Sequence, residues 1–165
     1  MTKTFLTLLL CLATAALCAC ATTPPFSREY LAEVDPTMTP EEAVEEGIKD
    51  TQVMWGGTII SSENRSDQTI ITVLYYPLDK SQRPQVEKTP ASRFKIVYPG
   101  YLETMLYAPD REITVHGTLQ NSMVGKVGDA PYHFAVVKAD KVYLWPLRSN
   151  DSKVRFGIGV GIGVH

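Results

Sequence analysis

The chain has 165 residues, 44% of them hydrophobic and 21% charged, a composition typical of one globular domain. Its 16 basic and 18 acidic residues give a formal net charge of −2, which argues against nucleic acid as a partner, since proteins bind it mainly by neutralising phosphates. All three cysteines lie within the first 20 residues, so the rest of the chain excludes a disulfide framework and a thiolate metal site.

Residues 1–19 predict a secretory signal peptide, because Lys3 is the only charge and an apolar run extends from Phe5 to Leu17. A run of about 13 residues is too short for a helix across a bilayer, which needs roughly 20. Leu17-Cys18-Ala19-Cys20 resembles the lipobox of bacterial lipoproteins. The resemblance implies cleavage before Cys20, lipidation of that cysteine and attachment of the mature chain to the lipid bilayer.

An ordinary signal peptide cut near Ala19 or Ala21 is the alternative, and it would release a soluble periplasmic protein. Ala21 occupies the position where an Asp retains bacterial lipoproteins at the inner membrane. The lipobox resemblance therefore implies the bacterial outer membrane, with the domain in the periplasm. A single acyl chain binds a membrane only marginally, whereas the several chains of a mature lipoprotein hold it permanently.

Residues 20–38 are rich in Thr and Pro and are predicted to form the lipidated N-terminus and a tether. A short helix follows, in which Thr39 is the N-cap, Pro40 fits the first position and Glu42 completes a capping box. The acidic run of this helix is interpreted as a solvated face rather than a cation or partner site; it comprises Glu41, Glu42, Glu45 and Glu46.

From residue 53 onward the sequence predicts strands separated by turns. The strands Val53–Glu63 and Gln68–Leu78 form a hairpin, and Gly56-Gly57 indicates a bulge or a close backbone approach. The third strand is Arg93–Tyr98, and the connection 100–106 after it is short and can be helical.

Ile113–Leu119 alternates, with Ile113, Val115, Gly117 and Leu119 on one face and Thr114, His116 and Thr118 on the polar face. A loop containing Gly125 and Gly128 follows, and then two strands, Tyr132–Lys138 and Lys141–Trp145, joined at Ala139-Asp140. So many short strands without helical alternation predict an all-β domain over residues 39–147. Their spacing favours a small antiparallel OB-like barrel over a sandwich.

The C-terminal tail, residues 148–165, places apolar residues and glycines in alternation from Val154 to Val164. As a strand it would have one apolar face and one bare backbone face, suited to a sheet edge, a membrane or a partner. A disordered tail is the alternative, because repeated glycine weakens any strand.

No motif in the chain predicts catalysis, a cofactor or a metal site. His116, His133 and His165 lack neighbours at ligand spacing. Tyr75 and Tyr76 would suit a stacking platform in an OB-type groove, but the net negative charge favours positions in the core and an adjoining surface.

Trp55-Gly56-Gly57-Thr58-Ile59 resembles the strand signature of the Slp family of outer-membrane lipoproteins. The resemblance covers roughly residues 26–147 and continues in an ordered series: Tyr76-Pro77-Leu78-Asp79, Arg83-Pro84, Arg93-Phe94, the run 111–117, Gly125 to Gly128, Tyr132 and Tyr143-Leu144-Trp145-Pro146. Ser92 and Asp110 depart from it, since the family favours glycine before arginine at these positions.

The resemblance implies a lipid-anchored envelope protein without enzymatic activity, induced on starvation or entry to stationary phase. A binding module is the alternative, in which the barrel face or the loops around Arg83, Arg93 and Trp145 hold an envelope protein, a glycan or a small ligand. An envelope hydrolase is a third interpretation, for which the sequence offers no catalytic set.

Overall fold

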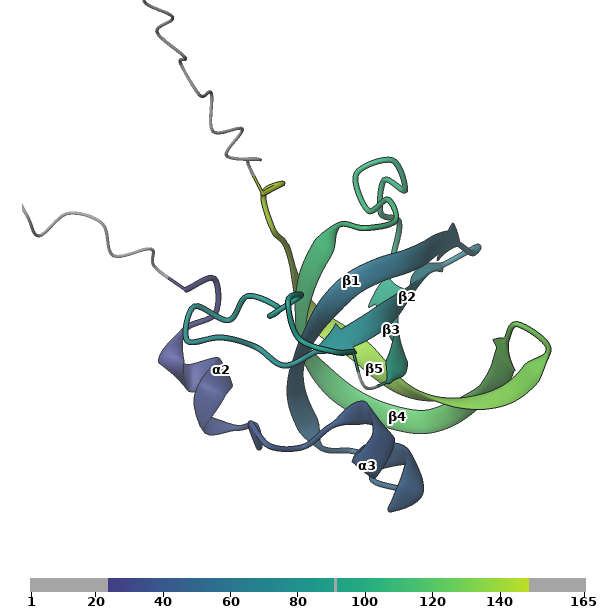
Figure 1. Cartoon of the computed structure of the whole chain (residues 1–165), viewed down its shortest axis with the longest axis horizontal. Coiled ribbons are helices and arrows are strands. Elements are labelled where there is room, and N and C mark those ends of the chain that lie inside the picture. Colours follow the sequence, from purple (N-terminus) through teal and green to yellow (C-terminus); the bar gives the residue numbers. More distant parts are fainter. Residues whose placement is uncertain (1–23, 91, 149–165) are drawn as a thin grey trace, which may run out of the picture.

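The computed structural model describes residues 24–90 and 92–148 (Figure 1). The predicted signal peptide, Cys20 and the tail beyond Arg148 lie outside the described residues, so the expectations about them stay predictions. Within the described part, no helix is both long enough and apolar enough to cross a membrane.

Five strands form a closed barrel in the order β1-β2-β3-β5-β4. Only β3 and β5 pair in parallel, and the other four pairs are antiparallel. This is the arrangement of the five-stranded Greek-key OB barrel, so the predicted all-β, OB-like fold is confirmed. The strands are β1 (Gln52–Asn64), β2 (Gln68–Tyr76), β3 (Arg93–Pro99), β4 (Glu112–Val127) and β5 (Ala130–Leu144).

The interior of the barrel is packed around Trp55 of β1, which is 2% exposed. Its ring meets those of Phe94 and Tyr75 edge to face, with centroids 5.4 and 6.3 Å away. The indole Nε1 donates a hydrogen bond to the Met38 carbonyl at 2.8 Å, so the only polar atom of the ring is satisfied. Tyr75 belongs to the core, as the charge balance predicted, and Tyr76 is buried as well rather than on the adjoining surface.

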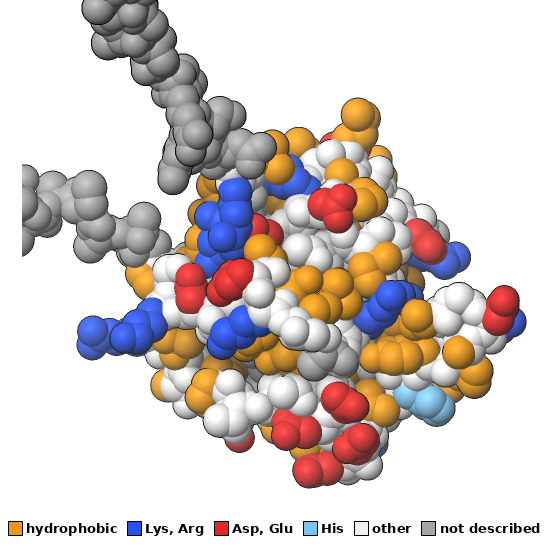
Figure 2. Space-filling view, viewed as in Figure 1, with side chains coloured by type: hydrophobic (Ala, Val, Ile, Leu, Met, Phe, Trp, Pro, Cys, Tyr) orange, Lys and Arg blue, Asp and Glu red, His pale blue; other side chains and the backbone are white. Residues whose placement is uncertain are grey.

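The helix α3 (Pro40–Glu45) packs on the barrel through Ala43, which is buried in the core cluster. The predicted capping box is confirmed, since Thr39 accepts from the Glu42 N–H and Glu42 accepts from the Thr39 N–H. The prediction of a solvated acidic face is also confirmed: Figure 2 shows acidic side chains gathered over α3, and the four are all exposed, namely Glu41, Glu42, Glu45 and Glu46.

The second half of the segment assigned to the tether packs against the barrel and contains the helix α2 (Arg28–Ala32). Phe26 is 2% exposed. Its N–H donates to the Gln82 side-chain oxygen, and its carbonyl accepts from the Gln82 amide nitrogen, both at 2.9 Å. The Gln82 side chain thus satisfies both backbone groups of Phe26, as the backbone of a neighbouring strand would. From Phe26 to Met38 the chain is part of the folded domain.

The strands β4 and β5 are longer than the sequence pattern indicates, and the predicted loop around Gly125 lies within their hairpin. β5 pairs with β3 only from Ala135 onward, and β4 pairs with β1 only up to Thr118. Residues 121–134 therefore form a two-stranded extension, here called the arm, which Figure 1 shows projecting from the barrel.

The predicted break at Ala139-Asp140 is a bulge rather than a turn. His116 pairs with Lys141 and Gly117 pairs with Ala139, so Asp140 is an extra residue within one continuous strand. Two further boundaries differ. β2 ends at Tyr76, just before Pro77, which lacks a ladder donor, and the connection 100–106 forms turns without a helix.

Two backbone positions, one within β1 and one in the turn before β4, explain glycine signals in the sequence. A Cβ on Gly57 would collide with the Leu74 backbone carbonyl, which confirms the predicted close approach of the two chains. Asp110 has φ of 66°, the left-handed conformation that glycine adopts without strain and that Asp tolerates. The left-handed backbone at Asp110 therefore accounts for the glycine that the family resemblance led us to expect at this position.

Candidate functional site

A wide, open groove of about 660 Å³ lies on the described surface, a volume suited to a small ligand or a short segment of polymer. Asp67 and Gln68 lie on one side, at the β1–β2 turn. The floor comes from the end of β3 and from β5, and the far side comes from β4 where it enters the arm. The groove thus lies between the β1–β2 and β4–β5 hairpins, which in OB barrels flank the ligand-binding face.

A bulge in β4 shapes the far side of this groove. Gln120 pairs with Val136, but Met123 pairs with Phe134, so Asn121 and Ser122 together oppose the single residue Ala135. The bulge leaves both side chains exposed at the root of the arm. The sequence signal for it is the polar Gln-Asn-Ser step, which interrupts the apolar alternation after Leu119.

The chemistry of the groove is polar and nearly neutral. Gln68, Gln120 and Asn121 contribute amides and Ser122 a hydroxyl, groups that both donate and accept hydrogen bonds. The formal charges of Asp67 and Lys138 cancel. An apolar surface accompanies these groups, formed by Val97, Pro99, Met123, Val124 and Val136. Such a lining suits a neutral polar ligand with an aliphatic or ring face, such as a glycan or a peptide segment.

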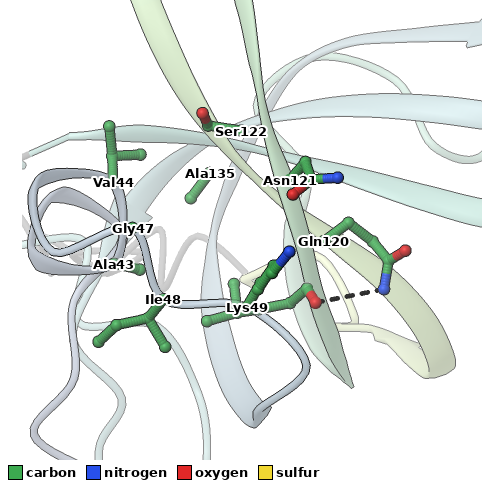
Figure 3. A pocket seen from close by; sticks show the side chains of 10 residues that line it. Ala43, Val44, Gly47, Ile48, Lys49, Gln120, Asn121, Ser122 and Ala135 are labelled. Atoms are coloured by element: carbon green, nitrogen blue, oxygen red, sulfur yellow. Dashed lines mark hydrogen bonds between the residues drawn. The ribbon is translucent and has the colours of Figure 1, made fainter.

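A second, smaller pocket of about 120 Å³ adjoins the same bulge (Figure 3). It lies between the α3–β1 connection, including Gly47 to Lys49, and β4 from Leu119 to Ser122. In Figure 3 the Gln120 amide reaches the Leu119 carbonyl, to which it donates a hydrogen bond of 3.2 Å. The bulge therefore separates a wide groove from a pocket that has room only for water or a side chain.

The arginine that the sequence offered as a binding residue, Arg83, belongs instead to a structural ion cluster. Arg83 Nε and Arg148 Nε each lie 2.5 Å from a different carboxylate oxygen of Glu112. Arg83 also lies over the Trp145 ring, 5.3 Å from its centroid. We call Arg83, Arg148, Glu112 and Trp145 the clamp.

The clamp ties the loop between β2 and β3 to the segment after β5. Arg83 donates to the Pro146 carbonyl at 3.1 Å and Arg148 donates to the Pro84 carbonyl at 3.2 Å. Burial alone would raise the pKa of Glu112, but the hydrogen bonds and charges of Arg148 and Arg83 outweigh it and lower that pKa. Because both carboxylate oxygens are engaged, the clamp serves the fold rather than a ligand. Arg93 is not part of the clamp, and its backbone N–H donates a hydrogen bond to the Tyr132 hydroxyl.

His116 departs from its expected place on an open polar face, since it is 2% exposed. The Tyr30 ring of α2 covers it at 4.7 Å between centroids. Its Nδ1 is 3.6 Å from an Asp140 carboxylate oxygen, and among the described residues neither ring nitrogen has a hydrogen-bond partner. Burial lowers the pKa of His116, against the opposing effects of Asp140 and Glu33. His133 is exposed on the arm, whereas His165 lies outside the described residues.

Thr114, also expected on the polar face, is buried within a chain of hydrogen bonds. It accepts from Trp145 Nε1 at 2.9 Å and donates to the Gln82 carbonyl at 2.8 Å. No sequence pattern near Gln82 predicts that it links Phe26 to Thr114 of β4. The link exists only because the fold brings the loop after β2 against both. Across residues 24–90 and 92–148, no three His, Cys, Asp or Glu side chains gather in a way that could hold a metal ion.

The fold and the lipobox-like leader together describe a small OB-like domain of a bacterial envelope lipoprotein. The chain belongs to the outer membrane lipoprotein Slp family, whose model matches residues 17–158. The predicted family resemblance and outer-membrane localisation are thereby confirmed. The match begins at Leu17 and so includes the residues that resemble a lipobox.

Relatives in two organisms are similar to this chain over 96 or 97 residues. An uncharacterized protein of Haemophilus influenzae is 36% identical over 96 residues, 58% of this chain and 52% of that protein. The outer membrane protein Slp of Escherichia coli K12 is 28% identical over 97 residues, 59% of this chain and 51% of that protein. The uncharacterized lipoprotein YeaY of the same strain is 25% identical over 96 residues, 58% of this chain and 49% of that protein. The matches thus span about half the length of these relatives.

Among solved structures, a small single-stranded DNA-binding protein of Streptomyces coelicolor is similar at 11% identity and a TM-score of 0.35. The match covers 59% of this chain and 95% of that protein. The likeness is too distant to bear on function.

Proposed function

We propose that the chain is held at the outer membrane by lipid on Cys20 and acts there without enzymatic activity, in a structural or stress role of the envelope. The match of the family model from residue 17 onward carries the proposal, because it includes the cysteine and the three residues before it. The clamp adds support, since Arg83, Arg148 and Glu112 are engaged in holding the domain's own loops.

Replacement of Cys20 by serine tests the anchor. The Cys20→Ser variant is expected to leave the outer-membrane fraction almost completely, because without the thioether lipid only the barrel remains. The measurement is the distribution of the protein between membrane and soluble fractions of the envelope. Cys18→Ser is the matched control, since that cysteine departs with the leader and its loss is expected to leave the distribution unchanged. A Cys20→Ser protein that stays in the outer membrane would contradict the proposal.

A second function, that of a binding module, is favoured by the groove rather than by the arginines that the sequence offered. Its uncharged amides and hydroxyl beside an apolar floor suit a glycan or a peptide segment of the envelope. In this case the groove would bind such a polymer, and the lipid on Cys20 would keep the protein at the membrane.

Filling the groove tests the binding function. Ser122→Trp introduces a bulky ring at its wall and is expected to abolish crosslinking of the lipoprotein to its partner in intact envelopes. Lys88→Trp, on an exposed loop outside the groove, is the control and should crosslink as the wild type does. Identical crosslinked products from all three proteins would refute a role for the groove.

A further inference from the structure

Exposed apolar side chains gather at one end of the barrel. Seven large hydrophobic residues are exposed in the described part of the chain, and four of them belong to this end. They are Tyr101 (70% exposed), Met105 (85%), Leu106 (57%) and Leu147 (73%), and we call them the apolar end. Over the loop 100–107, Figure 2 shows hydrophobic side chains projecting at the top of the molecule. Single exposed apolar residues are common on soluble proteins. A contiguous group of them, by contrast, usually marks a surface that contacts a partner or a membrane.

Arg111 joins the two parts of the apolar end. Its guanidinium donates to the Leu106 carbonyl at 3.1 Å and to the Trp145 carbonyl at 2.9 Å. Leu147 and Arg111 line the same small pocket. The loop 100–107 and the segment after β5 are therefore one surface.

The loop of the apolar end is held in place by polar contacts from the barrel. The Ser62 hydroxyl donates to the Tyr107 carbonyl at 2.6 Å, and Asn64 donates to the Leu102 carbonyl at 3.1 Å. The side chains of Leu102 and Tyr107 pack against the core. The loop thus sends one set of apolar side chains inward and presents Tyr101, Met105 and Leu106 outward from a fixed backbone.

The apolar end is linked to the start of the folded chain through a short series of contacts. The Phe26 N–H donates a hydrogen bond to the Gln82 side chain. Arg83, the residue after Gln82, forms an ion pair with Glu112. Arg111, the residue before Glu112, donates a hydrogen bond to the Leu106 carbonyl. In Figure 1 the start of the described chain and the segment after β5 lie on the left side of the molecule, and the loop 100–107 lies at its top. Cys20 is four residues before Pro24, a chain length that reaches at most about 14 Å. A lipid on Cys20 would hold the start of the folded chain close to the bilayer, and the contacts above connect that start to the apolar end.

The charge distribution favours an orientation in which the apolar end faces the bilayer. The loop 100–107 is fixed to Ser62 and Asn64 at the end of β1, whereas α3 leads into the beginning of that strand. The four exposed glutamates around α3 therefore lie at the opposite end of the barrel, as Figure 2 shows. An anionic lipid surface repels carboxylates, so it disfavours an approach by the α3 end.

We propose that the apolar end lies against the bilayer that holds Cys20, with Met105, Leu106 and Leu147 in the headgroup region. The inference rests on the lipid anchor of the proposed function and adds to it an orientation. The domain is docked on the membrane and does not hang from a tether. Tyr101, with an apolar ring and a polar hydroxyl, suits the boundary between lipid and water. The exposed glutamates of α3 face away from the bilayer.

Single cysteines can report the depth of the apolar end in the complete lipoprotein. The predicted mature chain has only the lipid-bearing Cys20, so Met105→Cys and Leu147→Cys accept a fluorophore at one place each. The labelled proteins are reconstituted into vesicles of phosphatidylethanolamine and phosphatidylglycerol. Val124→Cys is the matched control, since Val124 is 66% exposed but lies on the arm. We expect quenching by a bilayer-embedded quencher to be at least about twofold stronger at positions 105 and 147 than at position 124.

The other outcomes separate docking from anchoring. Protein that floats with the vesicles while position 105 is quenched no more than position 124 overturns the docking and leaves the anchor standing. Protein that does not float contradicts both. If position 105 is open to water in vesicles but protected in native envelopes, a protein partner covers the apolar end and the lipid surface is the wrong occupant.

Discussion

Trp55→Ala is expected to destabilise the barrel by about 3–5 kcal/mol, the largest effect of any single substitution considered for this protein. Trp55 is 2% exposed, and its removal would leave a cavity lined by the Phe94 and Tyr75 rings that it now contacts. The Met38 carbonyl would also lose its indole donor, and with it a link to the segment that leads into α3. A loss of this size is a large part of the stability of a typical domain.

The thermal midpoint of the purified lipoprotein measures this effect. A fall of about 15 °C or more is expected for Trp55→Ala, given the usual shift of several degrees for each kcal/mol. Tyr101→Ala is the matched control, because this aromatic side chain is 70% exposed and its removal leaves no cavity. Trp55→Ala and Tyr101→Ala proteins with equal midpoints would show that the core is not built around Trp55.

Glu112→Gln is expected to destabilise the protein by about 2–3 kcal/mol. Breaking a buried ion pair from one side costs about 3–5 kcal/mol, because the partner charge is left uncompensated. The cost is smaller here, since the side chains of Arg83 and Arg148 are 24% and 49% exposed and water can solvate them. The exposed pair Glu63–Arg65 is the control, with side chains 60% and 58% exposed, and Arg65→Ala should cost less than about 1 kcal/mol.

The contribution of the clamp depends on pH with a definite sign. The folded protein lowers the pKa of Glu112 below its ordinary value of 4.5, so folding favours the ionised form. The stabilisation is therefore complete above the unfolded pKa and is lost as the pH falls through the lower folded pKa. The difference in free energy of unfolding between wild type and Glu112→Gln should accordingly shrink from pH 7 to pH 3. A difference that is constant or larger at pH 3 would contradict the clamp as described.

Strand positions were predictable where one face of a strand meets the core and the other meets solvent. β2 and β3 have this pattern, whereas residues 53–57 of β1 are buried on both faces; the bounds of all three strands differ from the predicted ones by two residues or fewer. The arm could not be predicted in this way, because most of its β4 half is exposed and its polar Asn121-Ser122 step resembles a loop. Asp140 was similarly misleading, since an extra residue in a bulge has the same local composition as a turn.

The polar face of β4 shows a second limit of local patterns. Thr114 and His116 occupy the face that alternation assigns to solvent, yet the loop after β2 and the helix α2 cover them. The covering segments are distant in sequence, and one of them has the Thr- and Pro-rich composition of a tether. Only the closed barrel brings these pieces together.

The two candidate sites differ in how much of each the sequence contains. The lipid site is local, because four consecutive residues, 17–20, are enough to predict it. The groove collects side chains from the β1–β2 turn and from three strands, and its polar lining depends on a bulge. Arg83 and Trp145 were singled out from the sequence as notable residues, and the structure places both in the clamp, where Arg83 binds a carboxylate and a backbone carbonyl.

The mass of the mature amino terminus is the most direct test of the anchored lipoprotein. Protein purified from outer membranes is cleaved with a protease, and the peptide that begins the mature chain is analysed by mass spectrometry. The account predicts a peptide starting at Cys20 that carries diacylglycerol on sulfur and an acyl chain on nitrogen. A peptide starting at Ala21 or nearby, or an unmodified Cys20, would contradict the lipid anchor and with it the docked orientation of the barrel.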